Sequence, residues 1–343
     1  MTYLLAAAIS FVITFLLVPL NRKLSLRLGI NDFPRERSVH QEVIPKSGGL
    51  SLWLGILLSQ LILTLSGIQE FDSLFIGLVI GGTLILILGL LDDIFDLTPW
   101  TKIIIETCIV LLIIPFGFKI DLLTNPFNEA FHLWWGSIPF TILWFLLVMN
   151  AINLLDGLDG LATGIVMIVS LVVGFASIIC SHTLVAYFLF SIFGACIAFL
   201  RYNFYPASIF LGDAGSLYLG FMLAALSIAG NRQFKGATAM TMLIPLICLS
   251  IPIIDALLAV FRRVRHARSV FEADKHHLHH WMLRLGFPYK TVVYSGYFLT
   301  GLFGLISLGF LLVDRRILFM LVIVLGIILI ILFYNLAKKE FFR

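Results

Sequence analysis

The feature that most constrains the fold is a succession of apolar runs, most of them about 20 residues long, that follow one another along almost the whole chain. A helix of that length crosses the roughly 30 Å hydrocarbon core of a bilayer, and it satisfies its own backbone hydrogen bonds there. With 60% hydrophobic and only 12% charged residues, the composition lies far from that of a soluble domain. The sequence therefore predicts an all-α polytopic integral membrane protein, forming a single domain over residues 1–343. The eleven predicted spans are 3–20, 48–68, 73–91, 101–118, 137–152, 161–181, 183–200, 215–230, 236–261, 289–312 and 317–336.

Lysine and arginine are distributed unequally between the two sets of connections. Of the 23 basic residues, 18 fall on one side of the predicted membrane and five on the other. Because cytoplasmic loops carry an excess of positive charge, the richer side is predicted to be cytoplasmic, with the N-terminus outside and the C-terminus inside. The net charge is only +4 and no continuous basic patch is visible, so no nucleic-acid partner is expected.

The uncommon polar residues gather in the connections predicted to be cytoplasmic. They lie in five loops, at 34–50, 90–100, 150–160, 201–216 and 262–288. The longest outer connection, about 119–136, is instead rich in aromatic residues and suits an interfacial belt. An active site that faces the cytoplasm is therefore expected.

Three aspartates, Asp92, Asp93 and Asp96, end the third apolar run in the segment DDIFD. If the helix continues through them, Asp92 and Asp96 share one face, a spacing able to hold Mg²⁺ or to combine a charged with a proton-accepting carboxylate. The alternative is a solvated acidic cap just outside the bilayer.

The segment NAINLLDGLDGLATG, residues 150–164, places hydrogen-bonding side chains between two apolar runs. Asn153, Asp156 and Asp159 recur every three residues, and the neighbouring glycines leave room for a ligand. Such oxygen ligands suit Mg²⁺, which also accepts substrate phosphate. The alternative is a polar turn that uses Asp and Gly for its backbone geometry.

Two shorter features could meet a phosphate. Asp213 lies in FLGDAGS, before the eighth span, where its carboxylate could bind a metal and the free amides of the helix N-terminus could bind a phosphate. The alternative is that Asp213 is an ordinary N-cap. Lys46 in PKSGGL could supply a positive charge to a phosphate, or could serve membrane topology alone.

The last cytoplasmic loop holds five of the eight histidines, interspersed with arginine and lysine. They are His266, His276, His277, His279 and His280. The basic surroundings oppose a Zn²⁺ site and favour a hydrogen-bonding surface for a diphosphate. The alternative is a loop that only fixes topology, which would explain the arginines but not the histidines.

Acidic ligands for Mg²⁺ and a basic loop, on one face of a lipid-embedded chain, indicate phosphoryl transfer between a soluble nucleotide and a lipid. In their order, DDIFD, NAINLLDGLDGLATG, FLGDAGS and DKHHLHH resemble motifs of the polyprenyl-phosphate N-acetylhexosamine-1-phosphate transferase superfamily. The likeness, which includes the R-x-x-H-x-x-x-x-P-K-x-G-G pattern of residues 37–49, is to the WecA/TagO-like branch of glycosyltransferase family 4 and covers nearly the whole chain.

The resemblance implies a reaction and a setting. An N-acetylhexosamine 1-phosphate, by default GlcNAc-1-phosphate, would pass from a UDP-sugar to undecaprenyl phosphate with release of UMP. The enzyme would work in the bacterial inner membrane, at the first membrane step of a cell-envelope polysaccharide such as O-antigen lipopolysaccharide or teichoic acid. The lipid bilayer is an expected partner, and a homodimer is a further expectation.

The resemblance also implies roles for individual residues. Asn153 and Asp213 would hold Mg²⁺, for which Mn²⁺ is an alternative. Asp92 would deprotonate or position the lipid phosphate beside Asp93, while Asp156 and Asp159 would lie near the uridine and the metal. The expected substrate-binding residues are Lys46, Asn203, Phe210, His277, His279 and His280.

Several alternatives stay open at this point. The donor could be UDP-FucNAc, UDP-QuiNAc or UDP-MurNAc-pentapeptide, although the H-x-H-H pattern favours a simple N-acetylhexosamine. Direct attack by the lipid phosphate is favoured over an aspartyl-phosphate intermediate, because a phosphate monoester is already largely ionised at neutral pH. A prenyltransferase would need a second aspartate-rich helix, and a CDP-alcohol phosphotransferase would need further aspartates after Asp156. A transporter would need charges near the bilayer midplane.

Overall fold

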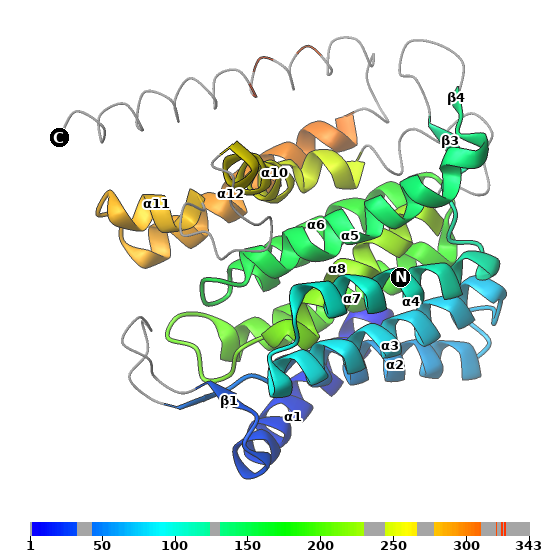
Figure 1. The fold of residues 1–343 in the computed structure, drawn as a ribbon. Coiled ribbons are helices and arrows are strands. Elements are labelled where there is room, and N and C mark those ends of the chain that lie inside the picture. Colours follow the sequence, from blue (N-terminus) through cyan, green and yellow to red (C-terminus); the bar gives the residue numbers. More distant parts are fainter. Residues whose placement is uncertain are drawn as a thin grey trace.

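The computed structural model shows a bundle of long helices, most of them running along a common direction (Figure 1). It describes residues 2–32, 43–123, 131–229, 244–265 and 278–309, with isolated positions at 320, 324 and 326. In chain order, the long helices up to residue 229 are α1 (Thr2–Leu28), α2 (Gly48–Leu65), α3 (Ser73–Phe95), α4 (Pro99–Ile113), α5 (Ser137–Leu155), α6 (Leu161–Ile179), α7 (Thr183–Asn203) and α8 (Gly212–Ala229). They are followed by α10 (Ser250–Arg265), α11 (Leu278–Arg284) and α12 (Tyr289–Gly309).

Within the described part of the chain, nine helices are long and apolar enough to cross a membrane. They correspond to the first eight predicted spans and the tenth, so the all-α polytopic fold class is confirmed. The ninth predicted span, 236–261, lies partly outside the described residues, and its later part belongs to the amphipathic helix α10. The eleventh span, 317–336, lies outside them apart from the isolated positions. The predicted orientation of the termini stays a prediction.

Two short antiparallel hairpins lie at opposite ends of the bundle (Figure 1). One pairs β1 (Asn31–Asp32) with β2 (Ile44–Pro45), and the other pairs β3 (Leu122–Leu123) with β4 (Phe131–His132). Two short 3₁₀ turns, η1 (Ile114–Phe116) and η2 (Trp134–Gly136), flank the second hairpin. The exposed Trp134 and Trp135 of η2 are consistent with the predicted aromatic belt.

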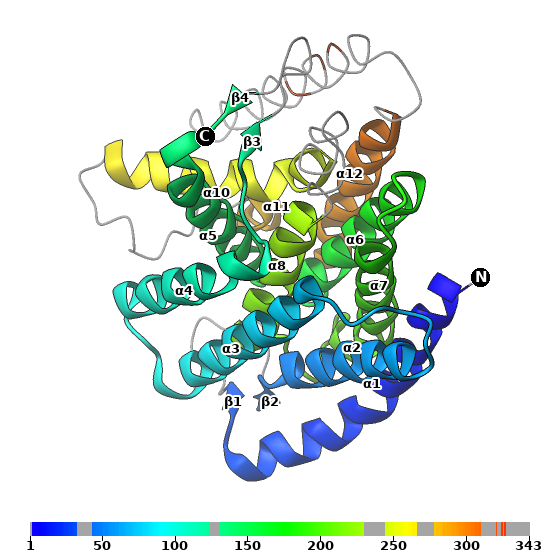
Figure 2. The ribbon, with the colours of Figure 1, turned by 90° about the vertical axis from the view of Figure 1, so that its right-hand side faces the viewer.

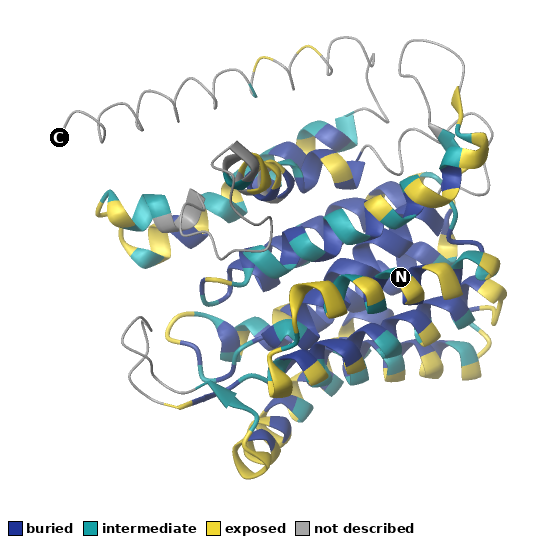
Figure 3. Cartoon of the chain, viewed as in Figure 1, coloured by how far each residue is buried: buried dark blue, intermediate teal, exposed yellow. Residues whose placement is uncertain are grey.

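Helix α8 forms the centre of the bundle, and α2, α3, α5, α6 and α7 pack against it (Figure 2). Small residues allow this burial, since Gly49 of α2 meets the backbone of Gly215, and Gly89 of α3 meets Ala214. Buried residues accordingly concentrate on the inner helices, while many residues on the outer faces are exposed (Figure 3). The exposed residues include many large apolar ones, such as Leu20 and Leu65, as expected of a lipid-facing surface.

Candidate active site

The last turn of α3 presents two aspartates to different partners. Asp92 Oδ1 accepts the amide of Leu97 at 2.9 Å, and its Oδ2 lies 2.7 Å from Lys102 Nζ. The helix ends at Phe95, and Asp96 adopts a left-handed backbone with φ of 48°. Asp96 therefore lies beyond the helix and does not continue the face of Asp92, so the predicted pairing at i and i+4 does not form in the helix.

Lys102 completes the charge balance of this turn. Helix α4 begins at Pro99, after a three-residue connection whose Thr98 side chain caps the new helix. This tight connection brings the first turn of α4 beside the end of α3, where Lys102 Nζ also lies 3.6 Å from Asp213 Oδ2. From the sequence alone, Lys102 is one of the basic residues that predict the cytoplasmic side of the membrane, and it has no predicted role in the site. The signal that could have found it is its position, ten residues after Asp92 and just across a Thr-Pro turn.

Asp93 caps the N-terminus of α8 from another helix. Its two carboxylate oxygens accept the amides of Asp213 and Ala214, each at 3.1 Å. Its side chain is 2% exposed, and Lys46 Nζ lies 3.9 Å from it. Because a carboxylate compensates the free amides and the positive end of the helix, α8 begins at Gly212, three residues before the predicted start.

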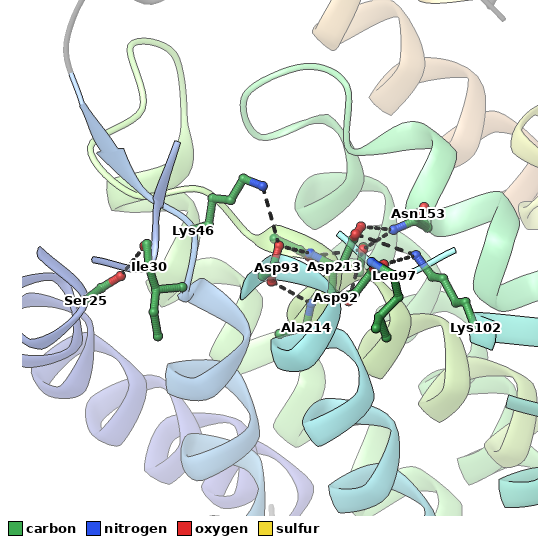
Figure 4. Close-up of polar contacts among 12 residues, drawn as sticks. Ser25, Ile30, Lys46, Asp92, Asp93, Leu97, Lys102, Asn153, Asp213 and Ala214 are labelled. Carbon is green, nitrogen blue, oxygen red and sulfur yellow. Dashed lines mark hydrogen bonds and ion pairs between the residues drawn. The ribbon is translucent and has the colours of Figure 1, made fainter. Parts of the chain in front are cut away.

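Asn153 and Asp213 meet, as the resemblance implies for the metal ligands. Helix α5 continues to Leu155, so Asn153 lies on the helix, and its side-chain amide donates to Asp213 and, at 3.0 Å, to Ser216 Oγ. Figure 4 shows the resulting row of side chains, from Lys46 through Asp93 and Asp213 to Asp92, Asn153 and Lys102. The Asp213 side chain is 36% exposed, whereas that of Asp92 is only 8% exposed. Asp213 is therefore the more accessible of these two carboxylates.

Asp156 follows directly after α5 and faces the same helix N-terminus. Its carboxyl group hydrogen-bonds the amide of Gly212. Burial raises the pKa of Asp156 well above its ordinary value, and the carboxylates of Asp213, Asp93 and Asp159 raise it further. A proton on Asp156 would relieve the repulsion among these acids.

The residues predicted to bind the nucleotide lie next to the row of side chains in Figure 4 but make their hydrogen bonds elsewhere. That row, with its carboxylates Asp92, Asp93 and Asp213, is called the carboxylate row below. Asp159 Oδ2 accepts the amide of Ala207 at 2.9 Å. The buried Asn203 accepts from Thr163 Oγ1 at 2.9 Å and donates to the carbonyl of Ile209 at 3.1 Å. Phe210 is tied through its backbone to the β2–α2 connection, since its amide donates to the Pro45 carbonyl at 2.8 Å and its carbonyl accepts the amide of Gly48 at 3.0 Å.

A cavity of 460 Å³ opens beside Lys46, between the end of α1, the first hairpin and the end of α3. Its lining combines apolar with charged residues: Leu28, Gly29, Ile30, Asn31, Asp32, Lys46, Asp93, Ile94 and Asp96. The carboxylate row therefore borders a space large enough for part of a substrate.

The predicted histidines of the last loop lie at the edge of the described residues. His277 lies outside them. His279 and His280 belong to the short helix α11, and their side chains are not among the described ones. The backbone of α11 is nevertheless placed next to α12.

A second polar contact lies one helical turn beyond Lys102 and joins Asn150, from the segment 150–164, to Glu106, which no sequence motif revealed. Glu106 is fully buried, and its Oε2 accepts from Asn150 Nδ2 at 3.3 Å, while Oε1 has no hydrogen-bond partner among the described residues. Glu106 and Lys102 are four residues apart on α4, so their side chains lie on the same face of that helix. Glu106 therefore extends the polar face of α4 from the site towards Asn150.

The residues present fit a Mg²⁺ ion that takes few protein ligands. No three His, Cys, Asp or Glu side chains form a ready metal cluster within the described ranges. Mg²⁺ commonly uses one or two carboxylates and completes its shell with water and substrate phosphate. Asp213 and Asp92 already share a cation, the Lys102 ammonium, and Asn153 could add its Oδ1 if its amide rotated.

Comparison with known proteins adds an independent observation. Residues 75–231 match glycosyl transferase family 4, and this match includes the segments that supply Asp92, Asp93, Asn153 and Asp213. The chain is 32% identical over 301 residues to a protein of Bacillus subtilis (strain 168) named "Probable undecaprenyl-phosphate N-acetylglucosaminyl 1-phosphate transferase", covering 88% of this chain and 82% of that protein.

Two further relatives come from other bacterial groups. The decaprenyl-phosphate N-acetylglucosaminephosphotransferase of Mycobacterium tuberculosis (strain ATCC 25618 / H37Rv) is 32% identical over 321 residues, with 85% of this chain and 78% of the relative covered. The undecaprenyl-phosphate alpha-N-acetylglucosaminyl 1-phosphate transferase of Escherichia coli (strain K12) is 28% identical over 294 residues, with 81% and 75% covered. The likeness to each relative thus extends over most of both chains.

Proposed function

The chain belongs to glycosyl transferase family 4, and from this membership we propose that it transfers GlcNAc-1-phosphate from UDP-GlcNAc to undecaprenyl phosphate, releasing UMP. The relatives' names support transfer of N-acetylglucosamine 1-phosphate to a polyprenyl phosphate. The observation that carries the proposal is the meeting of three carboxylates and two lysines at one end of a lipid-embedded bundle. With a divalent cation bound, such a site could hold two anionic phosphate substrates while the apolar chain of the lipid stays in the bilayer.

The open carboxylate of Asp213, with Asn153 beside it, would hold Mg²⁺ against the donor diphosphate. When bound, the ion would neutralise phosphate charge and polarise the phosphorus that is attacked. Lys46 and Lys102 lie on opposite sides of Asp213 in Figure 4, so each can bring a positive charge to a phosphate. His277, His279 and His280 would add hydrogen bonds to the diphosphate or sugar.

In the proposed chemistry, an oxygen of the lipid phosphate attacks the sugar-linked phosphorus of the donor. The new P–O bond forms as the bond to the UMP phosphate oxygen breaks, and UMP leaves. The attacking phosphate is largely ionised at neutral pH, so Asp92 serves to orient it rather than to act as nucleophile. Incubation with donor labelled in its sugar-linked phosphate, in the absence of lipid, should leave the protein unlabelled. A phosphorylated aspartate would overturn direct attack.

The nucleotide end of the site would be formed by Asp156, Asp159, Asn203 and Phe210. The internal hydrogen bonds of Asn203 support an indirect role, in which it shapes the segment that ends at Phe210. Asp159 supports the same segment through Ala207. Phe210 would then be the residue of this group that contacts the uracil.

The decisive test is turnover by the purified protein in detergent. With undecaprenyl phosphate and Mg²⁺, UMP should be released from UDP-GlcNAc faster than from other UDP-N-acetylhexosamines. If UMP were released only from UDP-FucNAc, UDP-QuiNAc or UDP-MurNAc-pentapeptide, the proposed donor would be wrong but the proposed sugar-1-phosphate transfer would stand. The absence of UMP release with every donor would reject the proposal.

The proposed setting follows from the same relationship. The protein would lie in the bacterial inner membrane with its site towards the cytoplasm, at the first membrane step of a cell-envelope polysaccharide. Mn²⁺ would substitute for Mg²⁺, and a homodimer is the proposed assembly.

A further inference from the structure

The first turns of α12 contact two loops of the candidate site at once. Tyr289, the first residue of the helix, hydrogen-bonds through its hydroxyl to both the amide and the carboxyl group of Asp159. Its ring stacks on Tyr205, with centroids 4.4 Å apart and planes inclined by 29°. One tyrosine thus joins α12 to the turn after α5 and to the loop before α8.

Asp159 carries this connection further. Its Oδ2 accepts the amide of Ala207, two residues beyond Tyr205, at 2.9 Å. The same loop continues to Phe210, the proposed uracil contact. A change at Tyr289 would therefore alter the turn at 156–160 and the loop at 204–210 together.

A second tyrosine, Tyr297, lies two helical turns further along α12 and also hydrogen-bonds to the turn after α5. The hydroxyl of Tyr297 donates to the carbonyl of Gly160 at 2.6 Å. Its ring fills the space beside Gly164, where an added Cβ would lie 2.2 Å from the hydroxyl oxygen. Tyr289 and Tyr297 are eight residues apart and lie on one face of α12, so both hold the same turn.

Helix α12 also fixes the position of the histidine-bearing helix α11. The connection between them spans only residues 285–288, and within it the amide of Phe287 donates to the Met282 carbonyl at 3.2 Å. Ser295 Oγ of α12 contacts Met282 Sδ at 3.9 Å. The backbone of His279 and His280 is therefore held to α12, and through α12 to Asp159 and Gly160.

We propose that Tyr289 and Tyr297 are positioning residues, here called the tyrosine latch, which tie α12, and through it α11, to the nucleotide wall formed by Asp156, Asp159, Asn203 and Phe210, and thereby set the affinity for the donor. The inference rests on the proposed function, because it assigns the wall to the nucleotide and α11 to the diphosphate or sugar. A latch that pre-orders both surfaces lowers the cost of ordering them when the donor binds. Among the described residues, the two hydroxyls bond to Asp159 and Gly160 and not to Asp92, Asp213 or Lys102, so the latch is expected to act on donor binding rather than on the chemical step.

The test compares Tyr289→Phe and Tyr297→Phe with Tyr294→Phe. The first two remove one latch hydroxyl each and keep the ring. Tyr294 lies on the same helix, and its half-exposed ring lies 5.7 Å from that of Phe204 and 6.3 Å from that of Tyr297. Tyr294→Phe keeps both ring contacts and removes a hydroxyl that, in the described part of the chain, does not bond to the turn at 156–160, so it is a matched control. We expect the KM for UDP-GlcNAc to rise about three- to tenfold in each latch variant, the effect of losing the one or two hydrogen bonds of a single hydroxyl, with kcat and the KM for undecaprenyl phosphate unchanged. Tyr294→Phe should match the wild type in all three.

Hydrogen exchange of the substrate-free protein gives a second readout that needs no turnover. Amides of residues 156–160 and 278–287 should exchange faster in both latch variants than in Tyr294→Phe. Wild-type exchange there, exchange that accelerates equally in α6 and α8, or equal changes in both KM values would overturn the latch. If the wild type releases no UMP, the proposed function is wrong. The hydrogen-exchange comparison then still tests whether the two tyrosines stabilise these segments.

Discussion

At the scale of single residues, Lys102 carries the charge balance of the site. Its ammonium lies 2.7 Å from Asp92 and 3.6 Å from Asp213, and its side chain is only 14% exposed. Removing one partner of such a buried group leaves the opposite charge uncompensated, which costs more than the pair contributed. The stability and the activity of the protein should therefore both depend on Lys102.

We expect Lys102→Met to lower the free energy of unfolding by about 3 kcal/mol and to abolish most turnover, because two carboxylates lose their counter-ion. Denaturation in detergent and UMP release measure the two effects. Lys119→Met is the control, since Lys119 pairs with Asp121 at 2.8 Å with both side chains exposed, and its loss should cost under about 1 kcal/mol. Equal losses in the two variants would contradict this account.

Asp156 gives the protein a predictable dependence on pH. Its pKa is raised above the ordinary value, so the folded protein keeps a proton that the unfolded chain releases near pH 4. The associated stability is complete below that pH and is lost as the pH rises towards the folded-state pKa. Asp156→Asn should therefore remove part of the decline in Tm as the pH rises above about 4, measured with chelator present. Parallel curves for the two proteins would show that Asp156 holds no such proton.

Residue chemistry made some site residues predictable and left others hidden. Asp92, Asn153 and Asp213 are conspicuous because polar residues are rare at the ends of apolar runs. Lys102 and Tyr289 are not, since a lysine in a cytoplasmic connection and a tyrosine near a membrane interface are both expected there for other reasons. Their roles depend on partners that only the packed structure brings near.

At the scale of elements, the site depends on how closely α3 and α8 approach. Gly89 has no side chain, and an added Cβ would lie 2.4 Å from Ala214 Cα and 2.6 Å from the Asp213 carbonyl oxygen. Both neighbouring atoms belong to the backbone of α8 and cannot rotate away. The distance between Asp93 and the helix that it caps is set by this contact.

Gly89→Ala should therefore push α3 from α8, costing about 1–3 kcal/mol of stability and lowering turnover as Asp213 shifts from Asp92. Gly301→Ala provides the comparison, because a Cβ added at this position of α12 would meet no atom within 4 Å among the described residues. That variant should be neutral, or more stable by about 0.5–1 kcal/mol from helix propensity. A fully active and stable Gly89→Ala protein would refute the close approach.

Element boundaries were the least predictable part of the fold. The third and fifth spans were expected to end at 91 and 152, yet α3 reaches Phe95 and α5 reaches Leu155, and α8 begins before its expected start. Apolar periodicity stops at the first charged residue, whereas helices end where backbone hydrogen bonds end. The cap that begins α8 comes from Asp93, 120 residues earlier, so no local pattern could reveal it.

At the scale of the whole molecule, the polar segments meet at one end of the bundle, as the predicted topology requires. The side of the membrane that this end faces stays a prediction from the basic residues. Topology could group the loops because each span reverses the chain direction. It could not tell which side chains touch, because that depends on helix rotation and packing.

Labelling with an impermeant maleimide tests the orientation in a background without the native cysteines. Glu70→Cys, in the exposed α2–α3 connection, should react in intact cells, because it lies on the predicted outer side. Thr98→Cys, in the connection beside Asp92, should react only after permeabilisation. The reverse labelling pattern would show that the protein has the opposite orientation in the membrane.

The cap that Asp93 places on α8 also bears on how the chain is made. Synthesis and insertion proceed from the N-terminus, so α3 enters the bilayer well before α8 has been translated. Until then, Asp93 has neither the two amides nor the adjacent helix end that it later serves. Among the described residues, Lys46, just before α2, lies near Asp93, and Lys102, at the start of α4, lies near Asp92. Each of the two aspartates at the end of α3 can therefore have a lysine close by once the first four helices have been made, before α8 is present.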